Sequence, residues 1–188
     1  MWACRLVSMD EVRRVQQMRM MWVLLAGLMV PVSGQAQTPA SGPAGEVQRS
    51  YATLKGNVLK AADKMPAGDY GYKPTPEVRT FARVVNHISE AQLRSCGAAN
   101  GTKETAKVPP ETADKATVVA ALNASFAECD KAYAALTDAN MTETFDAFGT
   151  KRSRVGLMWG NVSHDNEQYA TLALYLRLKG LVPPSSEK

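Results

Sequence analysis

Residues 80–96, TFARVVNHISEAQLRSC, contain a helix start, a buried helix face, a histidine and a cysteine within one short stretch. Thr80 is a typical N-cap residue. The side chains expected on the buried face recur every three or four positions: Phe81, Val85, Ile88, Gln92 and Cys96. The pattern predicts a helix that begins after Thr80 and carries His87 at the edge of the core.

Three further segments have the same periodicity. One helix is expected from about Glu46, another from about Asp114, and a last one from an N-cap at Ser153 to about Leu178. No segment shows the alternating pattern of a strand. The sequence therefore predicts one all-α domain, a four-helix bundle, over residues 46–188.

The N-terminal segment has the features of a secretory signal peptide. A run of 13 mostly apolar residues, MMWVLLAGLMVPV at positions 20–32, follows Arg19 and leads to small residues before a predicted cleavage after Ala36. This run is too short to span a bilayer. The residues before Met18 make the leader unusually long, which is what a start codon assigned too far upstream would produce. We expect a periplasmic or secreted protein with no membrane segment in its mature form. Residues 37–45, QTPASGPAG, are expected to form a flexible tether.

The charge of the mature chain argues against nucleic-acid binding. The chain has 22 basic and 18 acidic residues, and four of the basic and two of the acidic ones lie in residues 1–36, so the formal net charge falls from +4 to +2. Lys151, Arg152 and Arg154 form only a short basic cluster at the expected start of the last helix. The expected partner is a small molecule, and the sequence leaves the oligomeric state open, a homodimer included.

Two cysteines remain after the leader, Cys96 and Cys129. Export favours a disulfide between them, and the alternative is two ordinary buried cysteines. Cys96 lies 16 residues after Thr80 and Cys129 lies 15 after Asp114, so two parallel helices would place them at the same height. Antiparallel helices would separate them by on the order of 15 Å, too far for a disulfide. The predicted disulfide therefore implies a parallel pair joined by a long crossover.

A candidate metal site involves both histidines of the chain. His164 and Gln168 are four residues apart and share one face of the last helix, with a glutamine where a second histidine would complete a ligand pair. His87 would come from another helix. Glu90 and Glu167 each follow a histidine by three positions and are the less favoured candidates, since both fit a solvated helix face.

The segments VVNHISEAQLRSC and GNVSHDNEQYATLALYLRLKGLVPPSS, together with KPTPEVRTF, resemble the DinB superfamily, in particular an exported branch of DinB-like proteins. The resemblance implies a bundle whose second and third helices are parallel. It also implies a divalent metal, zinc or nickel, held by one histidine of the second helix and an H-x-x-x-H pair of the last helix. His87 and His164 match the first two ligands, whereas the third falls on Gln168.

The departure at Gln168 leaves three outcomes open. The amide oxygen binds the metal weakly, a carboxylate of Glu90 or Glu167 replaces it, or the metal has been lost. The resemblance implies a metal-dependent hydrolase or thiol transferase, with no catalytic residue assigned beyond the metal ligands. The alternative is a non-catalytic module that binds a ligand or partner and retains a degenerate metal site.

Overall fold

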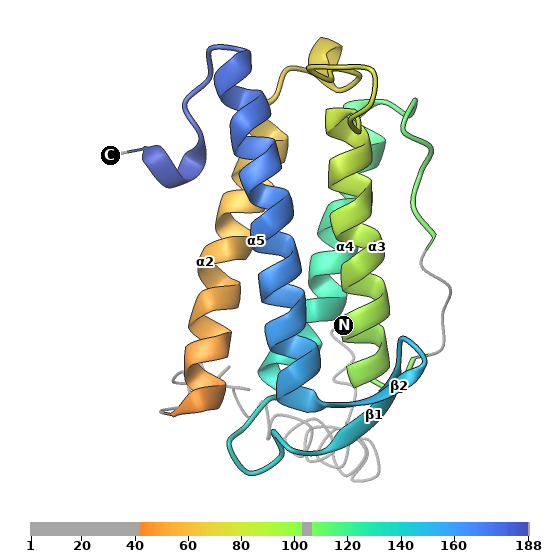
Figure 1. The fold of residues 1–188 in the computed structure, drawn as a ribbon, viewed down its shortest axis with the longest axis vertical. Coiled ribbons are helices and arrows are strands. Elements are labelled where there is room, and N and C mark those ends of the chain that lie inside the picture. Colours follow the sequence, from red (N-terminus) through yellow and green to blue (C-terminus); the bar gives the residue numbers. More distant parts are fainter. Residues whose placement is uncertain (1–41, 103–106, 188) are drawn as a thin grey trace, which may run out of the picture. The chain divides into compact units, whose positions relative to one another are not determined.

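The computed structural model describes residues 42–102 and 107–187, and the predicted signal peptide, residues 1–36, lies outside them. Four long helices form a bundle with a small antiparallel hairpin at one end (Figure 1). The elements in chain order are α2 (Pro43–Lys64), the 3-10 helix η1 (Ala67–Asp69), α3 (Phe81–Ala99), α4 (Lys115–Ala134), β1 (Thr144–Ala147), β2 (Thr150–Ser153), α5 (Arg154–Leu178) and the 3-10 helix η2 (Pro184–Ser186). The four predicted helices are therefore confirmed.

Three of these helices begin at the N-caps that the sequence predicts. The side chains of Thr80, Asp114 and Ser153 each accept a hydrogen bond from the backbone N–H three residues later, at 3.1, 2.7 and 3.1 Å. Helix α2 instead begins at Pro43, within the expected tether, whose residues 37–41 lie outside the described part. Its first turn is capped by Asp138, whose carboxylate accepts from the Ala44 N–H at 2.8 Å across 94 residues of chain. A cap from so distant a residue leaves no local sequence signal.

The predicted apolar stripes form the core. Every residue of the stripe expected on α3, from Phe81 to Cys96, is fully buried, as are Val118, Leu122 and Cys129 of α4. Helix α3 packs against both α4 and α5, and α2 packs against the same two helices. Within the described ranges, none of the helices combines the length and apolar character that crossing a membrane requires.

Helices α3 and α4 are parallel, and a disulfide joins them. Contacts between them follow the same order along both: Gln92 meets Ser125, and Cys96 is bonded to Cys129 with a Cα separation of 5.0 Å. The predicted disulfide and parallel pair are confirmed. Helix α5 runs the opposite way along α3, because Gln92 contacts Asp165 whereas the earlier Arg79 contacts the later Tyr175.

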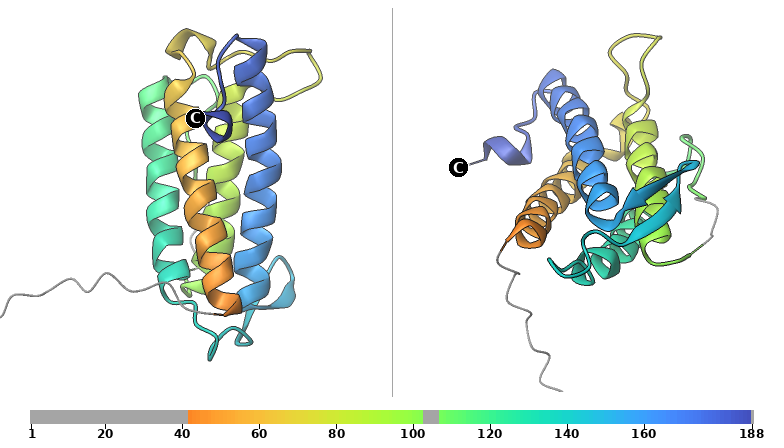
Figure 2. Two further views of the ribbon diagram at one scale, coloured as in Figure 1. Left: turned by 90° about the vertical axis from the view of Figure 1, so that its left-hand side faces the viewer. Right: turned by 60° about the horizontal axis from the view of Figure 1, so that its bottom comes forward.

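The expectation that the domain contains no strand was wrong. Strands β1 and β2 pair in the register Thr144 with Ser153 through Ala147 with Thr150. Phe148 and Gly149 form the two-residue turn with positive φ angles of 53° and 74°, a combination that matches the twist of a hairpin. The hairpin lies at one end of the bundle, against α3 and the start of α5 (Figure 2).

Candidate functional site

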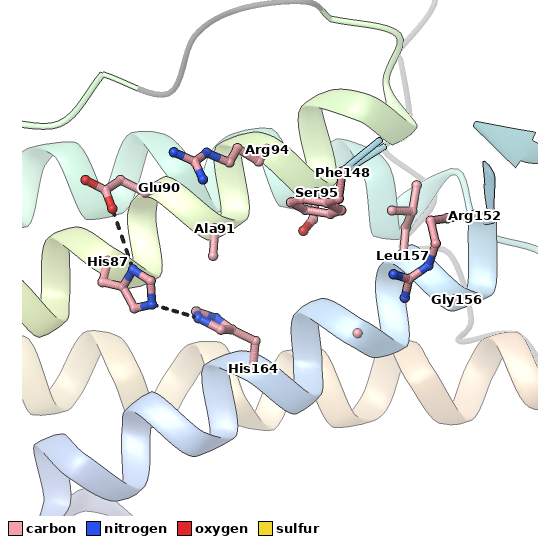
Figure 3. A pocket seen from close by; sticks show the side chains of 11 residues that line it. His87, Glu90, Ala91, Arg94, Ser95, Phe148, Arg152, Gly156, Leu157 and His164 are labelled. Atoms are coloured by element: carbon pink, nitrogen blue, oxygen red, sulfur yellow. Dashed lines mark hydrogen bonds and ion pairs between the residues drawn. The ribbon is translucent and has the colours of Figure 1, made fainter. Parts of the chain in front are cut away.

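A cavity of about 280 Å³ opens between α3, α5 and the hairpin. Eleven residues line it: His87, Glu90, Ala91, Arg94, Ser95, Phe148, Arg152, Gly156, Leu157, Gly160 and His164. The two histidines lie at one end and Phe148, Arg152 and Leu157 at the other (Figure 3). The two histidines proposed from sequence thus meet in one cavity.

The imidazole rings converge through the same type of nitrogen. His87 Nε2 and His164 Nε2 are 3.2 Å apart, and the ring planes are inclined at 70°. Two imidazole nitrogens bound at 2.0–2.1 Å to one tetrahedral ion would be about 3.3 Å apart. The observed separation therefore fits two ligands of a single metal ion.

A carboxylate lies on the opposite side of each ring. Asp165 Oδ1 is 2.9 Å from His164 Nδ1, and Glu90 Oε2 is 3.6 Å from His87 Nδ1. Glu90 also accepts a hydrogen bond from Arg83 at 3.0 Å, which fixes its position. A proton on Nδ1 of His164 pairs with Asp165 and leaves Nε2 of that ring as an acceptor toward His87. Glu90, at 3.6 Å, is too far from His87 Nδ1 for a hydrogen bond but close enough for its charge to act on that nitrogen.

Asp165 is almost fully buried, with 1% of its surface exposed, and a polar network holds it beneath His164. Its Oδ2 accepts hydrogen bonds from Gln92 at 2.9 Å and Asn161 at 3.2 Å. Tyr133 donates in turn to Asn161 at 2.9 Å. Burial raises the pKa of Asp165, while the hydrogen bonds from His164, Gln92 and Asn161 oppose that rise. The network therefore holds the Asp165 carboxylate in the position from which it orients the His164 ring.

The environment of His87 favours its neutral form. Burial lowers the pKa of His87 below its ordinary value of 6.5, the positive charge of Arg79 and the neighbouring His164 lower it further, and Glu90 partly offsets them. An imidazole that is neutral near pH 7 has a free lone pair. His87 can therefore accept a proton or bind a metal without first losing a proton.

The remaining candidate ligands lie elsewhere. Gln168 is 7% exposed and Glu167 is exposed, and neither lines the cavity. Glu90 does line it, as expected, but faces Nδ1 of His87. Within residues 42–102 and 107–187, no group of three or more His, Cys, Asp or Glu side chains is arranged to hold a metal. The side chains present thus fit two coordination positions, and the role of Gln168 as a third ligand stays a prediction.

Sequence reasoning missed three residues of this site. Phe148 and Arg152 belong to the hairpin. The only sequence feature that could have indicated this hairpin is the Phe-Gly pair between two four-residue segments that each begin with threonine. Asp165 was missed because an acidic residue in a helix usually faces water. Its position directly after His164 was the available signal.

Comparisons with known proteins agree on the fold. The family model described as the DinB superfamily matches residues 51–172, more than half of the chain. The crystal structure of a DinB-like protein from Bacillus cereus ATCC 10987 is similar at a TM-score of 0.62 and 18% identity, covering 73% of this chain and 93% of that one. The DinB-like protein YjoA from Bacillus subtilis gives 0.57 and 17%, covering 72% and 92%. No curated protein matches the chain.

Proposed function

The chain belongs to the DinB superfamily, and on that premise we propose that it is an exported divalent-metal-binding protein with metal-dependent hydrolase or thiol-transferase activity. His87 and His164 would hold the ion through their Nε2 atoms. Zinc or nickel suits this pair, because imidazole is a good ligand for both metals. Gln168 is the candidate for an additional oxygen ligand.

The observation that carries the proposal is the 3.2 Å separation of the two Nε2 atoms, each on a ring with a carboxylate beside its other nitrogen. The same separation suits a hydrogen bond from the N–H of one ring to the Nε2 of the other. A cation bound by both Nε2 atoms would replace that hydrogen bond. The arrangement is that of histidines oriented by outer carboxylates in metal sites.

The residues of the chain divide the work of such a site. Asp165 keeps the proton on Nδ1 of His164, and the buried network keeps Asp165 in place. Glu90 lies 3.6 Å from Nδ1 of His87, where its negative charge favours a proton on that nitrogen. A bound ion would supply a Lewis acid that lowers the pKa of a water or thiol and polarises a substrate oxygen. The cavity beside the histidines leaves room for the substrate.

Export is part of the proposal and favours hydrolysis over thiol transfer. A disulfide persists in an oxidising compartment, and Cys96–Cys129 is fully buried in the core. The sequence of residues 1–36 has the features of a signal peptide. Low-molecular-weight thiols are abundant in the cytosol and scarce outside it, so water is the better supplied nucleophile.

A second candidate function is a non-catalytic module that binds a small molecule in the same cavity. It is favoured by Gln168 at the position of a third histidine, and by the absence of any three-residue His, Cys, Asp or Glu group among the described residues. Such a protein would hold a metal weakly or not at all. The two functions differ in metal content.

Elemental analysis of the protein, expressed from the full chain and purified from the periplasm without tag or chelator, tests the proposal. We expect near-stoichiometric metal that disappears in the His87→Ala, His164→Ala double variant. Glu167→Ala is the matched control and should keep the metal, because Glu167 does not line the cavity. Absence of metal in the unaltered protein after loading with zinc, nickel or manganese would refute the metal site and favour the binding module.

A further inference from the structure

The Cys96–Cys129 disulfide lies next to the polar network that holds Asp165 beneath the histidines. We propose that this disulfide is a positioning element of the site: it fixes Asn161, which fixes Asp165, which in turn orients the His164 ring. Oxidation of the two cysteines then completes the site. The proposal deepens the function given above by naming what regulates it, and it rests on that function only where zinc affinity is the readout.

Asn161 touches both sulfurs of the disulfide. Its Oδ1 lies 3.9 Å from Sγ of Cys96 and 3.8 Å from Sγ of Cys129. Bonded sulfurs carry no hydrogen, so these are packing contacts. The other end of the same amide, Nδ2, donates a hydrogen bond to Oδ2 of Asp165 at 3.2 Å. Asn161 therefore has the disulfide at one end of its side chain and the carboxylate at the other.

Gln92 links the disulfide to the same carboxylate by a second route. Its backbone carbonyl oxygen lies 3.9 Å from Sγ of Cys129, and it precedes Cys96 by about one turn of α3. Its side chain donates to Oδ2 of Asp165 at 2.9 Å. Gln92 and Asn161 both hold Asp165, and both pack against the cross-link.

This part of the core has no slack. Cys96, Cys129, Gln92, Asn161 and Asp165 are each at most 2% exposed. Close-packed interiors transmit a displacement to their neighbours. Two sulfurs joined by a bond are closer together than two thiols in contact, so reduction moves the sulfurs apart against the residues that pack on them.

Reduction also adds hydrogen-bond donors at this point. Each thiol is a weak donor, and the nearest side-chain acceptor is Oδ1 of Asn161. That oxygen already accepts from the hydroxyl of Tyr133 at 2.9 Å. New donors on the sulfur side therefore compete for Asn161 and turn its amide away from Asp165. The His164 ring then loses the fixed carboxylate that holds its proton on Nδ1.

The oxidising step is thiol–disulfide exchange. One cysteine thiolate attacks an incoming disulfide, of a protein or of a small molecule, and forms a mixed disulfide, which the second cysteine thiolate then resolves. The Cys96–Cys129 bond forms, the incoming disulfide is reduced to two thiols, and the two cysteine protons end on those thiols. Because both sulfurs are fully buried in the folded bundle, the exchange takes place during folding. The site is thereby completed in a compartment that supplies disulfides.

Nuclear magnetic resonance of the histidine rings tests the coupling. The sequence contains two histidines, so long-range proton–nitrogen spectra of the untagged protein, expressed from the full chain, report on His87 and His164 alone. At about pH 8, above the ordinary imidazole pKa of about 6.5, the tautomers can be read without protonated rings. In the metal-free oxidised protein we expect the His164 proton on Nδ1, facing Asp165. Protein refolded from urea in reductant should show a mixture of tautomers.

Zinc affinity is the second readout. The Cys96→Ala, Cys129→Ala variant lacks thiols that can themselves bind zinc, and its affinity should be about tenfold lower than that of the oxidised protein, the lower end of what losing an outer partner of a ligating histidine costs. The Asn161→Ala variant keeps the disulfide and should show the same loss and the same mixture of tautomers. It therefore tests the coupling even if the cysteine variant does not fold.

Leu176→Ala is the control for loss of stability. It truncates a fully buried side chain eleven residues after Asp165 on α5, on the order of 16 Å away, and should destabilise the bundle while the His164 signals stay unchanged. The proposal is overturned if Asn161→Ala or the folded reduced protein keeps the oxidised tautomer, or if Leu176→Ala changes it as much.

The same experiments separate this proposal from the metal site. A tautomer change on reduction, in a protein that never holds zinc, supports the positioning role and refutes the metal proposal. Zinc that is held equally well by the oxidised protein and by the cysteine variant, with unchanged His164 signals, gives the reverse result.

Discussion

Breaking the Cys96–Cys129 disulfide should remove a large share of the stability of the domain. The bond joins two parallel helices across 33 residues of sequence, and both cysteines are fully buried. Without it, the unfolded chain gains conformational freedom that the native bundle does not. The chain-entropy relation gives about 3.7 kcal/mol at 25 °C for a loop of this length, against roughly 5–15 kcal/mol for the whole stability of a typical domain.

Urea unfolding followed by circular dichroism measures this difference directly. With a slope of about 1–3 kcal/mol per molar urea, the midpoint should fall by roughly 1.2–3.7 M when the protein is reduced. The Cys96→Ala, Cys129→Ala variant should show a similar fall and no further response to reductant, which makes it the matched control. Because the sulfurs are inaccessible in the native bundle, reduction should require urea.

The result that would refute this reasoning is a loss of less than about 1 kcal/mol in both the reduced protein and the double variant, with an unchanged urea slope. The cross-link would then contribute little, and the parallel packing of α3 and α4 would stand without it.

Three further predictions concern the site. Asp165→Asn should lower zinc affinity about 10- to 100-fold, because the amide favours the wrong tautomer of His164. The urea midpoint should stay the same or rise, because the variant removes a buried charge. An unchanged zinc affinity in a competition titration would exclude the orienting role of Asp165. Gln168→His should raise zinc affinity at least tenfold, since the Nε2 atoms of the two existing histidines already converge; an unaltered affinity would place position 168 outside the site. In the metal-free protein, the urea midpoint should fall as the pH drops below 6.5. Burial, Arg79 and His164 lower the folded-state pKa of His87, so the unfolded chain takes up the proton first. A His87→Gln variant with the same pH profile would disprove that assignment.

The bundle could be predicted from the sequence because most of its signals lie within single helices and the remaining one is a pair of cysteines. The N-caps Thr80, Asp114 and Ser153 act within their own first turns, and the apolar stripes repeat along each helix. The cysteine positions added the one long-range constraint that distinguishes parallel from antiparallel helices. Asp138, which caps α2 from a distant turn, had no such signal, and the start of that helix was accordingly placed too late.

The cavity was only half predictable. The histidines could be paired because His87 and His164 are the only two in the chain. Strand β2 reads Thr-Lys-Arg-Ser, without the apolar alternation of a buried strand, and Phe-Gly is not among the common hairpin turns. The hairpin residues Phe148 and Arg152 therefore could not be assigned to the cavity from sequence. Asp165 is hydrogen-bonded to Gln92 of α3 and to Asn161 of its own helix, which in turn accepts from Tyr133 of α4, and no single segment reveals this network.

The hairpin supplies part of the cavity lining, whereas the four helices supply most of the core. Its eight strand residues lie between α4 and α5 and supply Phe148 and Arg152 to the cavity, while the histidines and their carboxylates belong to the packed helices. Insertions or substitutions in such a surface element leave the core intact. Two proteins with the same bundle and the same histidines can therefore acquire different substrates through this short segment alone.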